Sequence, residues 1–402
     1  MPSTFQLIPA RRWFSPVGDF RDLTHGVANK REGMFVARPA FVETIDPPDF
    51  FVEPADVAGI GDGRGLGYSL DDFRLSVADA FLASMNDAQV EKLSLVPFGN
   101  NTYHLFVAPS LALAETQHEA FCHLHMMRHI GEETVVQSPA GPVPVLMRDR
   151  RPPEQRIEGD ALLLAARFTH FNYFHWIVDL LSRLWCMGMF ERPDEITLVM
   201  PDHRLSPFQT EILRQVGLRN PMIGLNRHVA EIERLHFPSF FAPGGYSRAQ
   251  CAWLGSLLKR AFGVADGLPG RRRLYISRAD AKWRGLTNED EVTRLLAARG
   301  FQVVVPGRLP VAEQARLFAS AEIVVAPHGA GNTNMLFAPR GACLIEVVAA
   351  ECPNNCYYML TKQNGQRYGR VLDRQADGAR GGGMTADLER LAVVVDQAIQ
   401  GC

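Results

Sequence analysis

From about Gly159 onward, short apolar runs alternate with segments that carry apolar residues at helical spacing. A strand that lies parallel to its neighbour needs a crossover of a dozen or more residues, which is usually a helix. The alternation therefore predicts an α/β fold of parallel strands joined by right-handed crossovers. The predicted strands are residues 161–168, 196–201, 273–278, 301–306, 322–327 and 343–348, and the predicted helices are 173–189, 207–216, 247–262, 288–299, 311–320, one from Asn334 and 385–400.

The segment GVADGLPGRRR, residues 263–273, divides this pattern into two series, because glycine and proline interrupt both helices and strands. We expect one Rossmann-like domain over residues 159–265, a second over 271–380, and a terminal helix within 384–402. In the second series, Asn288 and Glu291 have the spacing of a capping box at the start of a helix, and Gly300 is placed to end it.

Residues 1–158 do not share this pattern and predict a separate, mixed region that contains β-strands. Short alternating runs lie between residues 71 and 160, and a helix is predicted over 112–130. The glycine-rich run GIGDGRGLGYS, residues 59–69, does not meet the Gly-x-Gly-x-x-Gly spacing of dinucleotide sites, and no apolar strand precedes it. We interpret it as a turn-rich loop.

Composition limits the classes of partner. The formal net charge is −2 and the pI is about 6.6, which argues against a general nucleic-acid or anionic-membrane binder, since those proteins use clustered basic residues. Seven cysteines at scattered spacings suit reduced thiols better than a disulfide framework. We find no secretory leader and no run of 18 apolar residues. These features predict a cytoplasmic protein, either free or at the inner face of the membrane.

The stretch EIVVAPHGAGNTN, residues 322–334, runs from a predicted strand into a turn that a packed core does not require. Gly329, Ala330 and Gly331 have little or no side chain, so a ligand can approach the backbone amides there, and the next helix adds its dipole. His328 can donate to a phosphate oxygen, whereas Asn332 and Asn334 can bind hydroxyls or cap the helix. The alternative is a tight structural turn with a capping asparagine.

Basic residues follow the strand RLYIS in the same series. Arg278, Lys282 and Arg284 lie just past its end, where they could cover the charges of a diphosphate. Glu346, which we place at the end of the strand CLIEVV, could accept hydrogen bonds from a ribose or simply face solvent. Together with the turn at His328, these residues predict a nucleotide-diphosphate site beyond the carboxyl ends of the strands.

The first series contains its own polar group in FNYFHWIVDLLSRLW, residues 171–185. His175, Asp179 and Arg183 are each four residues apart and would share one helix face. A carboxylate beside an imidazole fixes its tautomer and raises its basicity, as a general base acting on a hydroxyl requires. A plain helix would show the same polar pairs while burying Trp176 on its other side. Candidate acceptor-binding residues are Asn172, Trp176 and Arg183.

Other chemistries find less support. Cys122, His125 and His129 would share a helix face with His123 adjacent, but three ligands on one helix must span two turns and no matching cluster is visible elsewhere, so we predict no metal site. The pair in CPNNC, residues 352–356, has three intervening residues where redox and zinc pairs usually have two. No P-loop and no Gly-x-Ser-x-Gly motif occurs, and no cofactor is predicted.

Five motifs in this order resemble the family 61 glycosyltransferases: NYFHWIVDLLSRL, RLYISRADAKWRGLTNEDEV, GFQVVVP, EQARLFASAEIVVAPHGAGNTNMLF and CLIEVV. The likeness spans roughly residues 159–348 and leaves the first 150 residues unmatched. The resemblance implies a GT-B fold, with two Rossmann-like domains facing a cleft. It also implies an inverting, metal-independent transfer from a nucleotide sugar, most often a UDP-sugar, to a glycan acceptor, as in capsular polysaccharide synthesis.

If so, Arg278, Arg284, His328 and the amides of Gly329–Asn332 would stabilise the leaving diphosphate in place of a metal, and no Asp-x-Asp metal anchor is present. His175, oriented by Asp179, would take the acceptor proton, or Asp179 would itself be the base. Two alternatives remain open. One is a nucleotide-sugar-binding or scaffold protein that has lost turnover, and the other is an epimerase of the same architecture.

Overall fold

The computed structural model of the chain describes most of the second half and separate strands of the first half. The described residues are 6–9, 28–31, 34–36, 39–57, 73–78, 81–91, 97–99, 102–103, 133–138, 141–146, 152–164, 171–200, 202, 204–225, 229–238, 246–265, 271–281, 284–350, 354–373 and 383–401. The loop expected at 59–69, the helix expected at 112–130 with its cysteine and histidines, and Lys282 lie outside them.

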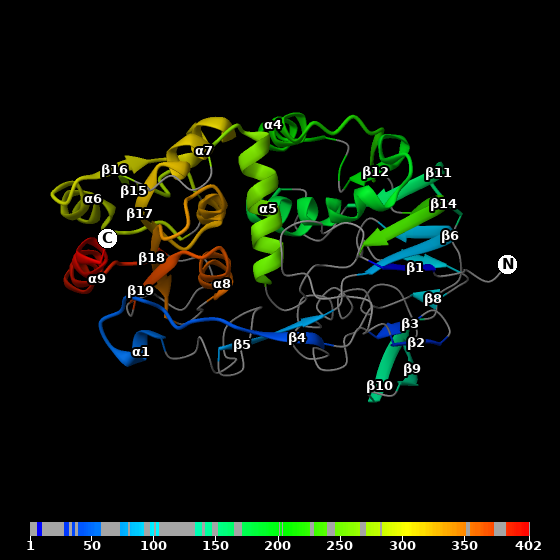
Figure 1. Cartoon of the computed structure of the whole chain (residues 1–402), viewed down its shortest axis with the longest axis horizontal. Helices are drawn as coiled ribbons and strands as arrows, with labels where there is room; N and C mark the ends of the chain where they lie inside the picture. The colour runs from blue at the N-terminus through cyan, green and yellow to red at the C-terminus, as the bar shows by residue number, and fades with distance from the viewer. Residues whose placement is uncertain are drawn as a thin grey trace. The chain divides into compact units, whose positions relative to one another are not determined.

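The chain divides into two compact units, each described here by itself (Figure 1). The first contains residues 1–42, 76–209 and 218–244, and the second contains 43–75, 210–217 and 245–402. This division differs from the boundaries expected from the sequence. Strand β6 (Phe81–Glu91), from the N-terminal region, pairs along its length with β14 (Val229–Pro238), so the N-terminal region and the first α/β series share one sheet.

The second unit is built on a parallel sheet with strand order β16-β15-β17-β18-β19. Four of these strands match predicted strands, and β19 was not predicted. Their bounds are β15 (Arg272–Ile276), β16 (Phe301–Val304), β17 (Ala321–Pro327), β18 (Cys343–Ala349) and β19 (Arg367–Asp373). The helices are α1 (Pro54–Val57), α5 (Arg248–Ala261), α6 (Glu289–Ala297), α7 (Val311–Ala319), α8 (Cys356–Gln363) and α9 (Leu388–Gln400).

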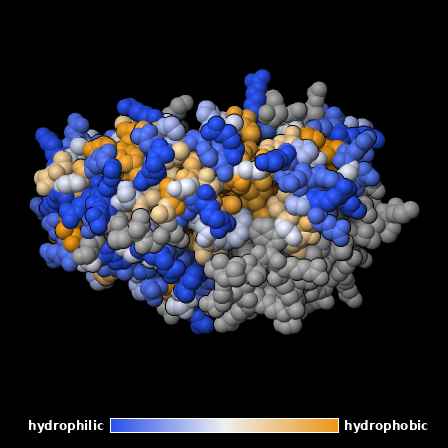
Figure 2. Space-filling view, turned by 45° about the horizontal axis from the view of Figure 1, so that its top comes forward, coloured by the Kyte–Doolittle hydropathy of each residue, from blue (hydrophilic) through white to orange (hydrophobic). Residues whose placement is uncertain are grey.

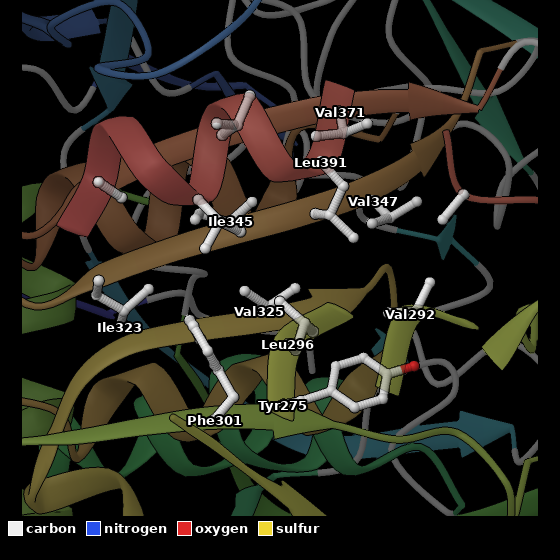
Figure 3. Close-up of a cluster of buried hydrophobic side chains, with 14 of the residues drawn as sticks. Tyr275, Val292, Leu296, Phe301, Ile323, Val325, Ile345, Val347, Val371 and Leu391 are labelled. Carbon is white, nitrogen blue, oxygen red and sulfur yellow. The ribbon is translucent and has the colours of Figure 1, made fainter. Parts of the chain in front are cut away.

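One face of this sheet carries the hydrophobic core of the unit (Figure 3). Leu296 of α6 and Leu391 of α9 are both completely buried against strand residues that include Ile345. Fully burying a side chain of this size contributes roughly 1.5–3 kcal/mol, so the two helices fix this face of the sheet. The terminal helix predicted within residues 385–400 is therefore part of the core of the second unit.

The opposite face of the same sheet buries charged and polar side chains among its apolar ones. Successive strand residues point to opposite faces of a sheet. Ile345 of β18 and Val371 of β19 belong to the core, so the residues next to them along each strand turn away from α9. Glu346 and Arg370 are register partners on β18 and β19 and share this second face, where Tyr368 also packs against Tyr358 of α8. Charged side chains are almost never fully buried unless they are paired, so this face differs from an ordinary hydrophobic core.

The first unit contains a mixed sheet of eight strands in the order β13-β12-β11-β14-β6-β7-β8, with β1 also paired to β6. The four strands from β13 to β14 run parallel, and β6 runs antiparallel to β14. The bounds are β1 (Gln6–Pro9), β7 (Pro97–Gly99), β8 (Thr102–Tyr103), β11 (Gln155–Leu163), β12 (Thr197–Met200) and β13 (Met222–Gly224).

The remaining described strands form two-stranded sheets. In addition, one helix has residues in both units. The pairs are β2 (Ala28–Arg31) with β3 (Met34–Val36), β4 (Pro39–Thr44) with β5 (Arg74–Ala78), and β9 (Glu133–Ser138) with β10 (Gly141–Leu146). The predicted helix 207–216 is α4 (Pro207–Val216), whose first three residues belong to the first unit.

The predicted helix 173–189 is helical but is not one regular α-helix. A short α-helical turn, α3 (Tyr173–His175), passes into a π-helical turn (Trp176–Leu180) and then a 3-10 helix (Leu181–Met189). Similarly, the helix expected from Asn334 is a 3-10 helix (Ala330–Leu336) that begins four residues earlier. π-Helical turns are rare and often occur at functional sites.

The capping box expected at Asn288 does not form. Asn288 makes no side-chain cap on α6; instead its Nδ2 donates to the Ala386 carbonyl and its Oδ1 accepts from the Ala386 amide, both at 2.9 Å. The tertiary contact satisfies both ends of the amide, whereas a cap would use only one. Gly300 does end the helix, with φ of +79°.

On the face that Figure 2 shows, hydrophilic and hydrophobic areas lie side by side, and the described residues include few large apolar side chains that are exposed. They are Val52, Phe171, Met222, Val303 and Val393. Among the described residues, no helix has the length and apolar character needed to cross a membrane.

Candidate functional site

In the second unit, the predicted basic residues and the small-residue turn follow adjacent strands. β15 and β17 are neighbours in the sheet. From β15 the chain crosses to β16 on one side of this pair, and from β17 it crosses to β18 on the other side. This is a topological switch point, where open parallel sheets bind ligands beyond the strand ends. Arg278 follows β15 and His328 follows β17, so the fold brings both segments to that position.

Arg278 lies directly over Gly329. A Cβ added at Gly329 would come within 1.6 Å of Arg278 Nη1 and 2.6 Å of its Cζ, distances that would force the guanidinium to move. The absence of a side chain at Gly329 therefore lets the Arg278 guanidinium lie against the backbone of the turn. Gly331 differs, since an added Cβ there would meet Ile276 and Pro306 only at an ordinary contact distance of 3.5 Å.

A second cation lies near Arg278. Burial lowers the pKa of Arg278, and the neighbouring charge of Arg284 lowers it further, while Tyr357 and Asp280 act in the opposite direction. Arg284 has a left-handed backbone with φ of +58°, which is uncommon for a residue with a long side chain. Two like charges close together, of which Arg278 is partly buried, are unfavourable by themselves. An anion placed between them would relieve the repulsion.

His328 is held from behind by a buried carboxylate. Its Nδ1 lies 2.6 Å from Glu346 Oε1, and the other carboxylate oxygen accepts from the Tyr368 hydroxyl at 2.5 Å. Asn332 Nδ2 adds a longer contact of 3.4 Å to Glu346 Oε1. On its other side, His328 packs against the Tyr357 ring, with 5.0 Å between ring centroids.

Glu346 is thus placed differently from the sequence-based expectation. It lies in the middle of β18, not at its end, and its side chain is completely buried. The expected ribose contact does not agree with this position, because the carboxylate already accepts from three protein donors. The reason is tertiary: β19 supplies Tyr368 and the turn supplies His328, both of which face this strand position.

Asn334 is also placed in a structural role. It is completely buried and donates to Gln314 Oε1 at 2.7 Å, and Gln314 Nε2 in turn donates to the Pro306 and Leu309 carbonyls. Ala330 begins the 3-10 helix, and its carbonyl accepts from the Thr333 hydroxyl. Asn332 contacts the His328 network through Glu346.

In the first unit, His175 and Asp179 form the expected pair. Nδ1 of His175 lies 2.5 Å from Asp179 Oδ2, and the two side chains are only 15% and 9% exposed. An ionised carboxylate only accepts, so Nδ1 carries the proton and Nε2 is the nitrogen left to act on a ligand. The pair lies on the segment after β11, whose neighbours β12 and β14 flank another switch point.

The three acceptor-side candidates all contact other groups of the first unit. Asn172 caps the first turn, because its Oδ1 accepts from the backbone amides of Phe174 and His175. Arg183 is buried and donates from Nη1 to the Leu163 carbonyl at the end of β11. Trp176 is completely buried and meets the Phe208 ring edge-on. Their expected role in binding an acceptor stays a prediction.

Sequence patterns missed Tyr357, Tyr368 and Arg370, which complete the polar face behind His328. Burial raises the pKa of both tyrosine hydroxyls well above the ordinary value, so both remain neutral donors. A signal was present: CYYMLTKQ followed by RYGRVLD continues the helix–strand alternation by one more step. Among the residues that the structure describes, no group of three or more His, Cys, Asp or Glu could hold a metal ion.

The fold and the site define a class: an α/β protein with parallel, Rossmann-like sheets, two arginines and a histidine at one switch point, and a histidine–aspartate pair at another. Residues 173–345 match the family described as Glycosyltransferase 61. The resemblance found in the motifs is thereby confirmed for this stretch of the chain.

A curated relative points the same way. The chain is similar to the EGF domain-specific O-linked N-acetylglucosamine transferase of Drosophila melanogaster, with 39% identity over 100 residues. The alignment covers 24% of this chain and 19% of the relative, so the chain matches about a fifth of that protein's length. Both findings support glycosyl transfer as the class of activity.

Proposed function

We propose that this protein transfers a sugar from a nucleotide-diphosphate donor, most simply a UDP-sugar, to a hydroxyl group of a glycan acceptor. The observation that carries the proposal is the position of Arg278, which lies across Gly329 beside Arg284 at a switch point of the sheet. A diphosphate bound there would meet two guanidinium groups, the turn amides and His328. Such fixed positive groups stabilise the charge that develops when the sugar–phosphate bond breaks.

On the acceptor side, we propose that His175 removes the proton from the attacking hydroxyl. Asp179 holds the proton of Nδ1, which leaves Nε2 able to accept one. The attack displaces the nucleoside diphosphate from the far side of the sugar carbon, so the configuration inverts. This step requires both sites to reach one substrate, and we therefore propose the GT-B arrangement, with the two units facing a shared cleft.

In this proposal the donor site works without a metal ion, because Arg278, Arg284 and His328 supply the positive charge. A placement in the cytoplasm and a role in capsular or other surface polysaccharide synthesis are part of the same proposal, supported by the scattered cysteines and by the family resemblance. Because the fly relative is named as an N-acetylglucosamine transferase, the N-acetylglucosamine form of the proposed UDP-sugar is the first donor to test.

The test is ligand-induced thermal stabilisation with UDP-, GDP-, CMP- and ADP-sugars in the presence of EDTA. We expect one nucleotide class to raise the melting temperature, and Arg284→Ala and His328→Ala to abolish the shift. Arg294→Ala is the matched control, since Arg294 is an exposed arginine on α6 in the same unit. No shift with any sugar nucleotide would refute the donor site.

Turnover decides between an enzyme and a protein that only binds nucleotide sugars. Release of the nucleoside diphosphate is measured with a glycan acceptor library, for wild type and His175→Ala. Acceptor-dependent release that His175→Ala abolishes supports the transferase. Donor binding without release would favour the binding protein, and release that needs no acceptor would favour hydrolysis or epimerisation.

A further inference from the structure

The buried carboxylate behind His328 suggests how the proposed donor site obtains its positive charge. Glu346 is 0% exposed, and its two oxygens lie 2.6 Å from His328 Nδ1 and 2.5 Å from the Tyr368 hydroxyl. A buried carboxylate is tolerated only when hydrogen bonds replace its lost hydration. The short distances indicate charge-assisted hydrogen bonds, in which Glu346 accepts from both partners.

This contact fixes the orientation of the imidazole. Because Nδ1 donates to Glu346, the ring cannot turn over without breaking a charge-assisted bond, and the Tyr357 ring packs against it at 5.0 Å. The second nitrogen, Nε2, is on the opposite edge of the ring and points away from Glu346. Nε2 accepts when the imidazole is neutral and donates when a second proton is bound.

The charges around His328 come from several elements. Glu346 is on β18, Tyr368 and Arg370 are on β19, and Tyr357 and Cys356 begin α8. Arg278 and Arg284 follow β15, with Asp280 beside Arg278. Arg370 is the register partner of Glu346, is 1% exposed, and has no hydrogen-bond partner for its guanidinium among the described residues.

A diphosphate bound at Arg278 and Arg284 would add at least two negative charges to the site that the turn at His328 borders. A nearby opposite charge favours the charged form of a titratable group. Donor binding and protonation of His328 would therefore reinforce each other through linkage.

We propose that Glu346 is a positioning residue that holds His328 through Nδ1, and that binding of the nucleoside diphosphate is accompanied by uptake of one proton from solvent at Nε2. The proton then lies between Nε2 and a phosphate oxygen. This inference rests on the proposed function, because it requires a diphosphate at Arg278 and Arg284. It adds that a proton on His328 completes the site, and that Glu346 and Tyr368 hold this imidazole in place.

The experiment is calorimetric titration of the full chain with UDP in two buffers of equal pH and different ionisation enthalpy. The difference in apparent binding enthalpy gives the number of protons taken up. We expect uptake of up to one proton at neutral pH. UDP binding should also tighten as the pH falls toward 6.

Glu346→Gln and His328→Asn should each abolish the proton uptake, and Glu346→Gln should weaken UDP binding about 10- to 100-fold, the usual effect of losing a hydrogen bond to a charged group. A merely structural glutamate would lower the melting temperature without changing the proton count. Arg294→Ala is the control that should leave both affinity and uptake unchanged.

Equal UDP binding enthalpies in the two buffers would overturn the inference, and wild-type protein alone suffices for that result should Glu346→Gln fail to fold. UDP binding that depends on Arg278 but takes up no proton would refute this inference and leave the proposed function intact. Failure of UDP and every other nucleoside diphosphate to bind would refute both.

Discussion

Arg278 lies so close to Gly329 that any side chain at position 329 would occupy the space of its guanidinium. We therefore predict that Gly329→Ala displaces Arg278 and weakens nucleoside-diphosphate binding by about 10-fold or more, comparable to the loss of one charge-assisted hydrogen bond. Binding is measured by titration with UDP. Gly285→Ala is the matched control, because an added Cβ there meets no atom within 4 Å. Equal losses of UDP affinity in Gly329→Ala and Gly285→Ala would contradict the prediction that Arg278 is displaced.

The second prediction concerns the His175–Asp179 pair. His175→Ala should lower kcat by about 10²- to 10⁴-fold, the usual range for removal of a general base. Donor affinity should remain at the wild-type value, because the proposed donor residues belong to the second unit. Initial rates of nucleoside-diphosphate release are compared with donor affinity for the same variant.

Asp179→Asn separates the two possible bases. If Asp179 acts by orienting His175, the double variant should be no slower than His175→Ala, because residues that act as a unit are not additive. If Asp179 is itself the base, Asp179→Asn should retain almost no activity while His175→Ala retains most of it. The kcat values of the three variants distinguish these cases.

Acid should destabilise the first unit through Asp160, Arg234 and His236. Hydrogen bonding to Arg234, opposed by burial and assisted by His236, lowers the pKa of Asp160 to about 2. Its stabilising contribution is complete above the ordinary value of 3.8 and is lost as the pH falls through about 2. Burial lowers the pKa of His236 below its ordinary 6.5, so stability also begins to fall below pH 6.5, where the unfolded chain binds the proton more readily.

The measurement is the unfolding midpoint of wild type and Asp160→Asn from pH 7 to pH 2. We expect the variant to be less stable at pH 7 by a few degrees and to converge with wild type near pH 2. The difference should shrink in 1 M salt, because Arg234 is 55% exposed. A difference in unfolding midpoint between wild type and Asp160→Asn that stays constant down to pH 2 would mean that the ion pair does not cause it.

Asn288 should hold the C-terminal segment in place. Its side chain makes two hydrogen bonds to the backbone of Ala386, directly before α9. Asn288→Ala should cost about 1–3 kcal/mol, since it leaves the partly buried backbone groups of Ala386 without these partners. Hydrogen exchange should rise in α9 and remain unchanged in α7. Asn288→Asp keeps the acceptor and should lose less, so an equal loss in both variants would contradict the two-bond account.

Much of the second unit could be predicted from local sequence. The strand at 322–327 and the helix at 311–320 were expected within one residue of their observed bounds, because apolar periodicity and turn residues are local signals. The pairing of β14 with β6 could not be predicted, since it joins strands more than a hundred residues apart in the chain. Similarly, the π-helical turn after His175 leaves the α-helical spacing of the sequence intact and is visible only in the backbone.

For the candidate sites, the sequence alone determined which residue types are available: a histidine and an aspartate four apart, arginines after one strand, and a histidine before small residues after another. The tertiary structure decided what each residue contacts. It placed Arg278 over Gly329 because β15 and β17 are neighbours, and it buried Glu346 behind His328 because β19 brings Tyr368 to the same face. Spacing along the chain is a local property, whereas burial and hydrogen-bond partners depend on which distant strands become neighbours in the sheet.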